Sequence, residues 1–138
     1  MLFVCEDNSA LSPMAEAIFR SFFPDLEVQS AGRYPAHVRR PVRSVLRQIE
    51  VDDIGLCSKD ILAVDMDEVS EVIGLGLPDS SFPIPSRFSI EWWVLPDPAC
   101  APVQEQEDSY SASRDELVRR ILSLGRERGW VPARSIEI

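Results

Sequence analysis

Cys5 is the residue of this chain whose position favours chemistry most clearly. It ends a short apolar run, Met1–Cys5, that predicts a buried strand, and Ser12-Pro13 predicts a helix start a few residues later. The free N–H groups and the dipole of a helix N-terminus attract negative charge and lower the pKa of a nearby thiol. Cys5 is therefore a candidate nucleophile. A small buried side chain at a strand end explains the same pattern without chemistry, and the spacing alone favours that second interpretation.

Strand-like and helix-like segments alternate along the chain. The expected strands are residues 1–5, 26–30, 71–75 and 92–95, and the expected helices are 12–23, 41–49 and 115–128, with 58–62 as the start of a short further helix. Residues 76–91 and 102–114 predict loops. We expect one α/β domain over residues 1–138, with a four-stranded parallel sheet flanked by helices on both faces. Ligands of such folds bind beyond the carboxyl ends of the strands, where Cys5 lies.

Composition and charge argue against several classes of function. The chain has 138 residues and a net charge of −9, which opposes nonspecific binding to nucleic acid or to anionic membranes. No apolar run reaches the roughly 18–20 residues of a membrane span. Three cysteines without a CxxC pair, and a single histidine, predict neither a metal site nor a cofactor. Acidic residues follow the first apolar run at once, so we expect no secretory signal and a cytoplasmic protein with reduced thiols.

Several motifs resemble, in order, those of the low-molecular-weight protein tyrosine phosphatases and of the thioredoxin-coupled arsenate reductases that share their fold. In that family the first strand ends in Cys, five residues follow, and then Arg and Ser or Thr precede a helix start with Pro. The first twenty residues resemble this pattern: MLFVCEDNSALSPMAEAIFR. Later segments resemble further family motifs: SAG at 30–32, SKDI at 58–61, VIGLG at 72–76 and WWVLPDPA at 92–99. The resemblance covers nearly the whole chain and implies this fold and a cysteine-dependent hydrolase or reductase.

The resemblance implies roles for four residues. Cys5 matches the nucleophile, and Ser12 matches the hydroxyl that hydrogen-bonds its thiolate. Asn8 matches the residue that shapes the loop, and Asp97 matches the general acid. Asp-Pro is also a common turn at a strand end, which is the alternative interpretation of Asp97. Given the resemblance, we favour the acid position. The oxyanion loop itself would consist of Glu6, Asp7, Asn8, Ser9, Ala10 and Leu11.

The loop departs from the family pattern in its charge. Leu11 stands where the family carries the Arg that clamps the oxyanion, and Leu offers no donor. Losing one oxyanion donor typically costs about 10²–10³ in rate. Glu6 and Asp7 add negative charge, which opposes both an anionic substrate and the Cys5 thiolate. The two relay cysteines of the arsenate reductases are replaced by Gly76 and Phe82.

Two further features of the sequence are the adjacent tryptophans and the single histidine. Strand alternation places one of Trp92 and Trp93 in the core and the other, partly exposed, near the mouth of the site. His37 lies in a loop among arginines, and we interpret it as an exposed polar residue.

Three hypotheses for function remain open. In the first, the chain is a catalytically impaired member of the family that binds a protein partner or a ligand other than phosphate, and holds a small oxyanion or phosphotyrosine-like ligand only weakly. In the second, it is an active phosphatase or arsenate reductase that uses Cys5 and Asp97, with the missing charge supplied by another arginine: Arg33, Arg39, Arg40, Arg43, Arg47 or Arg87. In the third, it is a thiol redox protein that pairs Cys5 with Cys57 or Cys100.

Overall fold

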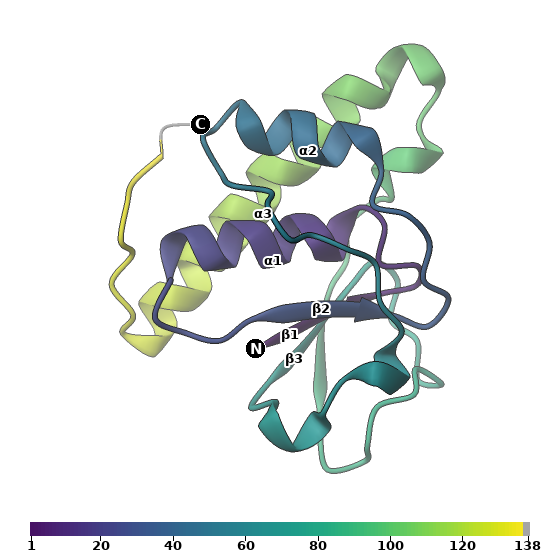
Figure 1. Cartoon of the computed structure of the whole chain (residues 1–138), viewed down its shortest axis with the longest axis vertical. Coiled ribbons are helices and arrows are strands. Elements are labelled where there is room, and N and C mark those ends of the chain that lie inside the picture. Colours follow the sequence, from purple (N-terminus) through teal and green to yellow (C-terminus); the bar gives the residue numbers. More distant parts are fainter. Residues whose placement is uncertain (137–138) are drawn as a thin grey trace.

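A four-stranded parallel sheet forms the centre of the computed structural model, which describes residues 1–136 (Figure 1). Its strands lie in the order β2-β1-β3-β4. Their bounds are β1 Leu2–Cys5, β2 Gln29–Gly32, β3 Val72–Leu75 and β4 Ile90–Trp93. Because all pairings are parallel, the four carboxyl ends meet at one edge of the sheet. The expected single α/β domain with a four-stranded parallel sheet is confirmed.

Three α-helices cover one face of the sheet and gather on one side of it in Figure 1. They are α1 (Leu11–Phe22), α2 (Arg40–Arg47) and α3 (Gln106–Arg128). Apolar side chains recur at helical spacing along α1, and this stripe is fully buried against Phe3 of β1 and Ile121 of α3. None of the described helices is long and apolar enough to cross a membrane.

The opposite face of the sheet is covered by two short 3-10 helices and the loop that precedes β4. The 3-10 helices are η1 (Ile61–Ala63) and η2 (Met66–Glu68). Ile61 and Phe82 pack there against Leu2 and Val4 of β1. Helices therefore flank both faces, as expected, but those on this face are single turns of three residues.

The predicted loop at 102–114 is wrong, because α3 already begins at Gln106. Two 3-10 turns, η3 (Pro98–Cys100) and η4 (Val103–Glu105), precede it. Tyr110 is 1% exposed and extends the buried stripe of α3 toward its N-terminus. Glu107 and Asp108 lie in the first turn, where negative charge stabilises a helix. The surrounding polar residues concealed this stripe in the sequence.

Several boundaries differ from the prediction by one to three residues, and α1 carries the difference that matters for the site. This helix begins at Leu11 with Ala10 as its N-cap, so Ser12 lies inside the first turn. The helix start predicted from Ser12-Pro13, with Ser12 as the capping residue, is therefore wrong in its cap: the Ser12 hydroxyl bonds the Cys5 sulfur and does not cap the helix.

Candidate active site

The loop of residues 6–10 joins β1 to α1 at the carboxyl edge of the sheet. Its carbonyl oxygens accept three hydrogen bonds from the segment that follows β2: Tyr34 N to Glu6 O, Ala36 N to Asp7 O and Arg39 N to Ser9 O, each 2.9 Å. Gly32, at the end of β2, lies so close that a Cβ on it would stand 2.7 Å from the amide nitrogen of Asn8. The SAG motif therefore ends in the residue that lets the loop approach the sheet.

Cys5 lies at the end of β1, buried, with its Sγ 2.7 Å from Oγ of Ser12. Burial raises the pKa of the Cys5 thiol above its ordinary value, and the negative charge of Asp7 acts in the same direction. Hydrogen bonds from the Ser12 hydroxyl and from the amides of Ser12 and Asn8 lower this pKa, but by less. The thiol is thus held protonated at neutral pH.

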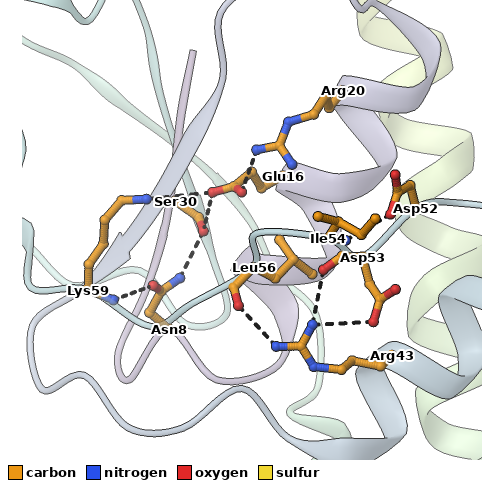
Figure 2. Close-up of polar contacts among 10 residues, drawn as sticks. All are labelled: Asn8, Glu16, Arg20, Ser30, Arg43, Asp52, Asp53, Ile54, Leu56 and Lys59. Atoms are coloured by element: carbon orange, nitrogen blue, oxygen red, sulfur yellow. Dashed lines mark hydrogen bonds and ion pairs between the residues drawn. The ribbon is translucent and has the colours of Figure 1, made fainter.

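Asn8 shapes the loop through its backbone and through its side chain, which lies between Ser30 and Lys59 in Figure 2. Its φ is +49°, in the left-handed region that Asn adopts more readily than most residues. Its Nδ2 donates to Oγ of Ser12 at 2.8 Å and to Oγ of Ser30 at 3.0 Å. Its Oδ1 accepts from the amide of Lys59 at 2.9 Å. One amide side chain thus joins the loop, β2 and the segment before η1.

A buried carboxylate, Glu16 on α1, continues this network (Figure 2). The Ser30 hydroxyl donates to its Oε1 at 2.9 Å, and Nη2 of Arg20 donates to its Oε2 at 2.7 Å. The ammonium of Lys59 lies 3.8 Å away. Two cations and a hydroxyl therefore compensate the buried charge. Sequence reasoning missed this group; the signal was a carboxylate on the apolar face of an expected helix.

Leu11 is buried, 5% exposed, and lies in the core formed by α1 and the sheet. Its side chain also forms part of the wall of the cavity beside Cys5. A hydrocarbon surface therefore occupies the position at which the resemblance implies a guanidinium.

The loop carries its own anions. Glu6 is exposed, and Asp7 is half-buried. Oδ1 of Asp7 accepts a hydrogen bond from the amide of Ser9 at 3.2 Å. The Asp7 carboxylate thus already accepts the Ser9 N–H, a donor that would otherwise be free to bind an anion.

Two arginines lie beside the loop, and acidic side chains engage both of them. Arg33 pairs with Asp79 and with Glu6, the latter at 3.3 Å. Arg39 donates from Nε to Oγ of Ser9 at 3.3 Å, and its Nη2 lies 3.9 Å from the Asp7 carboxylate. Among the described residues, none of the arginines or lysines lines the cavity. Three other candidate arginines pair elsewhere: Arg43 and Arg47 with Asp53, and Arg87 with Asp67.

Asp97 is exposed, follows β4 and lines the same cavity as Cys5. Its Oδ1 accepts from the amide of Ala99 at 2.9 Å, which caps the turn at 98–100. The thiol of Cys100 lies 3.6 Å from its Oδ2. The structure therefore brings the predicted nucleophile and the predicted acid to one cavity, and Asp97 also makes the turn that its sequence predicts.

The cavity has a volume of about 820 Å³ and mainly apolar walls. Trp92, half-buried, lines it, while its neighbour Trp93 is buried in the core, as strand alternation predicts. The other lining residues are Cys5, Glu6, Asp7, Ala10, Leu11, Leu75, Gly76, Leu77, Pro78, Asp79, Phe82, Val94, Leu95, Pro96 and Asp97.

All three cysteines are free thiols, and Cys57 and Cys100 are exposed while Cys5 is buried. Cys5 is the cysteine that lines the cavity in the described part of the chain. Within residues 1–136 there is no group of three or more His, Cys, Asp or Glu side chains that could hold a metal ion. His37 is exposed, as expected.

Comparisons with known proteins agree with this geometry. The family model described as low molecular weight phosphotyrosine protein phosphatase matches residues 1–77. An arsenate reductase in the phosphate binding state is similar in structure, with a TM-score of 0.79 at 24% identity over 91% of this chain and 95% of that chain. An arsenate reductase from Archaeoglobus fulgidus DSM 4304 has a TM-score of 0.72 at 26% identity, over 89% and 96%. A low molecular weight protein tyrosine phosphatase from T. tengcongensis has a TM-score of 0.73 at 22% identity, over 91% and 97%.

No match was found among the curated proteins. The parallel sheet and the three helices packed on it form an α/β fold that these solved structures share. The family model covers more than half of the chain. The chain belongs to the low molecular weight phosphotyrosine protein phosphatase family.

Proposed function

We propose that this protein is a catalytically impaired member of its family, in which the cavity beside Cys5 binds a ligand or partner without a phosphate group. The observation that carries the proposal is the side chain of Leu11, which presents hydrocarbon to the cavity. A phosphoryl or arsenate group there meets no guanidinium fork to neutralise it or to stabilise its transition state.

The charges around the loop support the same conclusion. Asp7 and Asp97 line the cavity, and the Asp7 carboxylate already accepts the Ser9 amide. The N-terminus of α1 favours an anion, but only by a fraction of the free energy that a charged clamp supplies. A dianionic ligand would therefore enter against two carboxylates, and a protonated Cys5 would be a poor nucleophile for it.

Binding of inorganic phosphate tests this proposal without any assumption about turnover. We expect phosphate to leave the amide ¹H–¹⁵N resonances of residues 6–12 unshifted in the wild type. We expect Leu11→Arg to produce a saturable shift of the same resonances, since the variant restores the bidentate donor. Leu11→Met is the matched control, because it conserves volume without adding charge. Saturable phosphate shifts in the wild type would contradict the proposal.

A second candidate function has one specific observation in its favour. Arg39 packs against the loop, with its Nε 3.3 Å from Oγ of Ser9, so its guanidinium could turn toward a bound oxyanion. The protein would then be an active phosphatase or arsenate reductase, with Cys5 as nucleophile and Asp97 as general acid. This candidate predicts turnover in the wild type that Arg39→Ala abolishes and Arg40→Ala leaves unchanged.

Thiol redox chemistry has less support than either candidate. It needs a second cysteine close to Cys5, with Cα atoms within about 7 Å. In the described part of the chain no second cysteine lines the Cys5 cavity, and Gly76 and Phe82 stand at the relay positions that the resemblance implies.

A further inference from the structure

We propose that the cavity beside Cys5 binds a small organic cation, in which an aromatic or branched apolar body carries one ammonium, amidinium or guanidinium group. This inference rests on the proposed function, because an impaired oxyanion site leaves the cavity free for another ligand. The cavity of about 820 Å³ lies within the range of small-molecule sites. A concave space of this size fits a small molecule better than it fits the flat surface of a protein partner.

The walls of the cavity define the apolar part of the ligand. Leu11 and Leu75 lie beside Cys5, and Trp92, Phe82 and Val94 provide further apolar surface. The Trp92 ring packs directly over β3, because Gly74 leaves room for it. Phe82 meets the same ring in an edge-to-face contact, with centroids 6.2 Å apart. Both aromatic side chains are thus held in place for a planar or branched apolar group.

The charged groups at the cavity define the other part of the ligand. Four carboxylates line it, and no lysine, arginine or histidine does so among residues 1–136. The four are Glu6, Asp7, Asp79 and Asp97. Arg33 neutralises Asp79, and Arg39 lies 3.9 Å from Asp7. Asp97 accepts hydrogen bonds only from neutral groups, an amide and a thiol.

Charge complementarity therefore favours a cation beside Asp7 and Asp97, the two carboxylates that we call the rim of the cavity. The N-terminus of α1 is a positive pole at the loop, and Asp7 offsets it by accepting a hydrogen bond from the Ser9 amide. A cation at the rim can approach Asp7 and Asp97 while its apolar body contacts the Trp92 ring, whose face also attracts cations.

Three probes of nearly equal size test the inference: benzamidine, benzamide and benzoate. We titrate each into the wild-type protein at low salt and follow the amide ¹H–¹⁵N resonances of residues 75–77 and 92–97. We expect saturable shifts with benzamidine and no saturation with benzoate. For benzamide we expect a Kd at least about fivefold higher than for benzamidine, which corresponds to the upper range for an exposed charge pair.

Two variants connect the selectivity to the rim. Asp7→Asn and Asp97→Asn keep the oxygen that accepts the Ser9 or Ala99 amide, but they remove the charge. Each should raise the Kd of benzamidine about two- to fivefold and leave that of benzamide unchanged. Asp25→Asn, at an exposed position after α1, makes the same charge change away from the cavity and should alter neither.

The outcomes separate this inference from the proposed function. Equal affinity for benzamidine and benzamide, preference for benzoate, or no saturation with any probe would overturn the inference and leave the impaired-enzyme proposal standing. Benzamidine shifts that persist unchanged in both rim variants would overturn it as well. Saturable binding of phenyl phosphate in the cavity would instead overturn the proposed function itself.

Discussion

Oγ of Ser12 lies 2.7 Å from Sγ of Cys5, although the side chain of Leu11, the residue between Ser12 and the loop, has no polar atom. The hydroxyl partner of the candidate nucleophile is therefore present, and Leu11 stands at the position of the arginine clamp that the resemblance implies. Asn8 holds the same Ser12 hydroxyl in place through Nδ2 at 2.8 Å. The loop thus places the Ser12 hydroxyl and the Asn8 amide around Cys5, while no arginine or lysine of residues 1–136 lines the cavity.

The three thiols should react with iodoacetamide in a defined order. Cys57 is exposed and should react first. The charge of Asp97 raises the pKa of the exposed Cys100 thiol, so Cys100 should follow. Cys5 should react last, because it is buried and burial raises the pKa of its thiol. Peptide mass spectrometry of timed samples gives the order; a Cys5 that reacts first would contradict the geometry described for it.

The Cys5 thiol should also make the free energy of unfolding decrease as the pH rises above neutral. Its pKa is raised in the folded protein, so the folded state keeps the proton after the unfolded chain has lost it. The resulting stability is fully present below the unfolded pKa, about 8.5, and is lost as pH rises toward the folded value. The free energy of unfolding of the wild type should therefore fall relative to that of Cys5→Ser between neutral pH and pH ~10. Urea titrations of both proteins at several pH values measure this difference, and parallel curves would refute the prediction.

Asn8 should contribute strongly to stability. Asn8→Ala removes its hydrogen bonds to Ser12, Ser30 and Lys59, and places a less tolerant residue at φ +49°. We expect a loss of about 2–4 kcal/mol in the free energy of unfolding. Asn8→Gly is the control for the backbone, and it should lose about 1 kcal/mol less, because Gly adopts positive φ without strain. Urea unfolding measures both, and a wild-type value for Asn8→Ala would show that the network contributes nothing.

Gly74 should couple to the Trp92 ring at the cavity wall. A Cβ on Gly74 would stand 2.7 Å from Cδ2 of Trp92, so Gly74→Ala must displace the ring. The expected cost is about 1–3 kcal/mol. Trp92→Leu removes most of the clash, so the two substitutions should cost less together than the sum of their separate costs. A double-mutant cycle by urea unfolding measures the coupling; strict additivity would mean that the ring does not occupy this position.

The sequence predicts the strand that ends at Cys5 and the opposite orientations of Trp92 and Trp93 better than it predicts the elements around them. The apolar run up to Cys5 and the alternation of Trp92 and Trp93 depend on local patterns, and both expectations agree with the structure. The start of α3 was missed, because the buried stripe that Tyr110 extends is interrupted by polar residues on the exposed face. On the second face the sequence indicates a short helix from residue 58, where the structure has the 3-10 turn η1; the second turn, η2, has no helical period to detect.

The network beneath the loop is the part that sequence alone did not suggest. Glu16 lies on the apolar face of α1, and its partners come from the same helix, from β2 and from the segment before η1. Ser30 and Lys59 are far from it in sequence. The parallel pairing of β1 with β2 places Ser30, and the hydrogen bond from the Gly32 amide to the Lys59 carbonyl places Lys59. Long-range pairing of this kind leaves no local signal.

Turnover of para-nitrophenyl phosphate tests the central claim most directly, namely that Leu11 disables the site. The wild type should match the Cys5→Ser blank, and Leu11→Arg should exceed it by about 10² or more, since one oxyanion donor is typically worth about 10²–10³ in rate. Leu11→Met should stay at the blank, and circular dichroism should show that all variants fold. Turnover by the wild type that Cys5→Ser abolishes would contradict the claim, and so would a folded Leu11→Arg protein that remains at the blank.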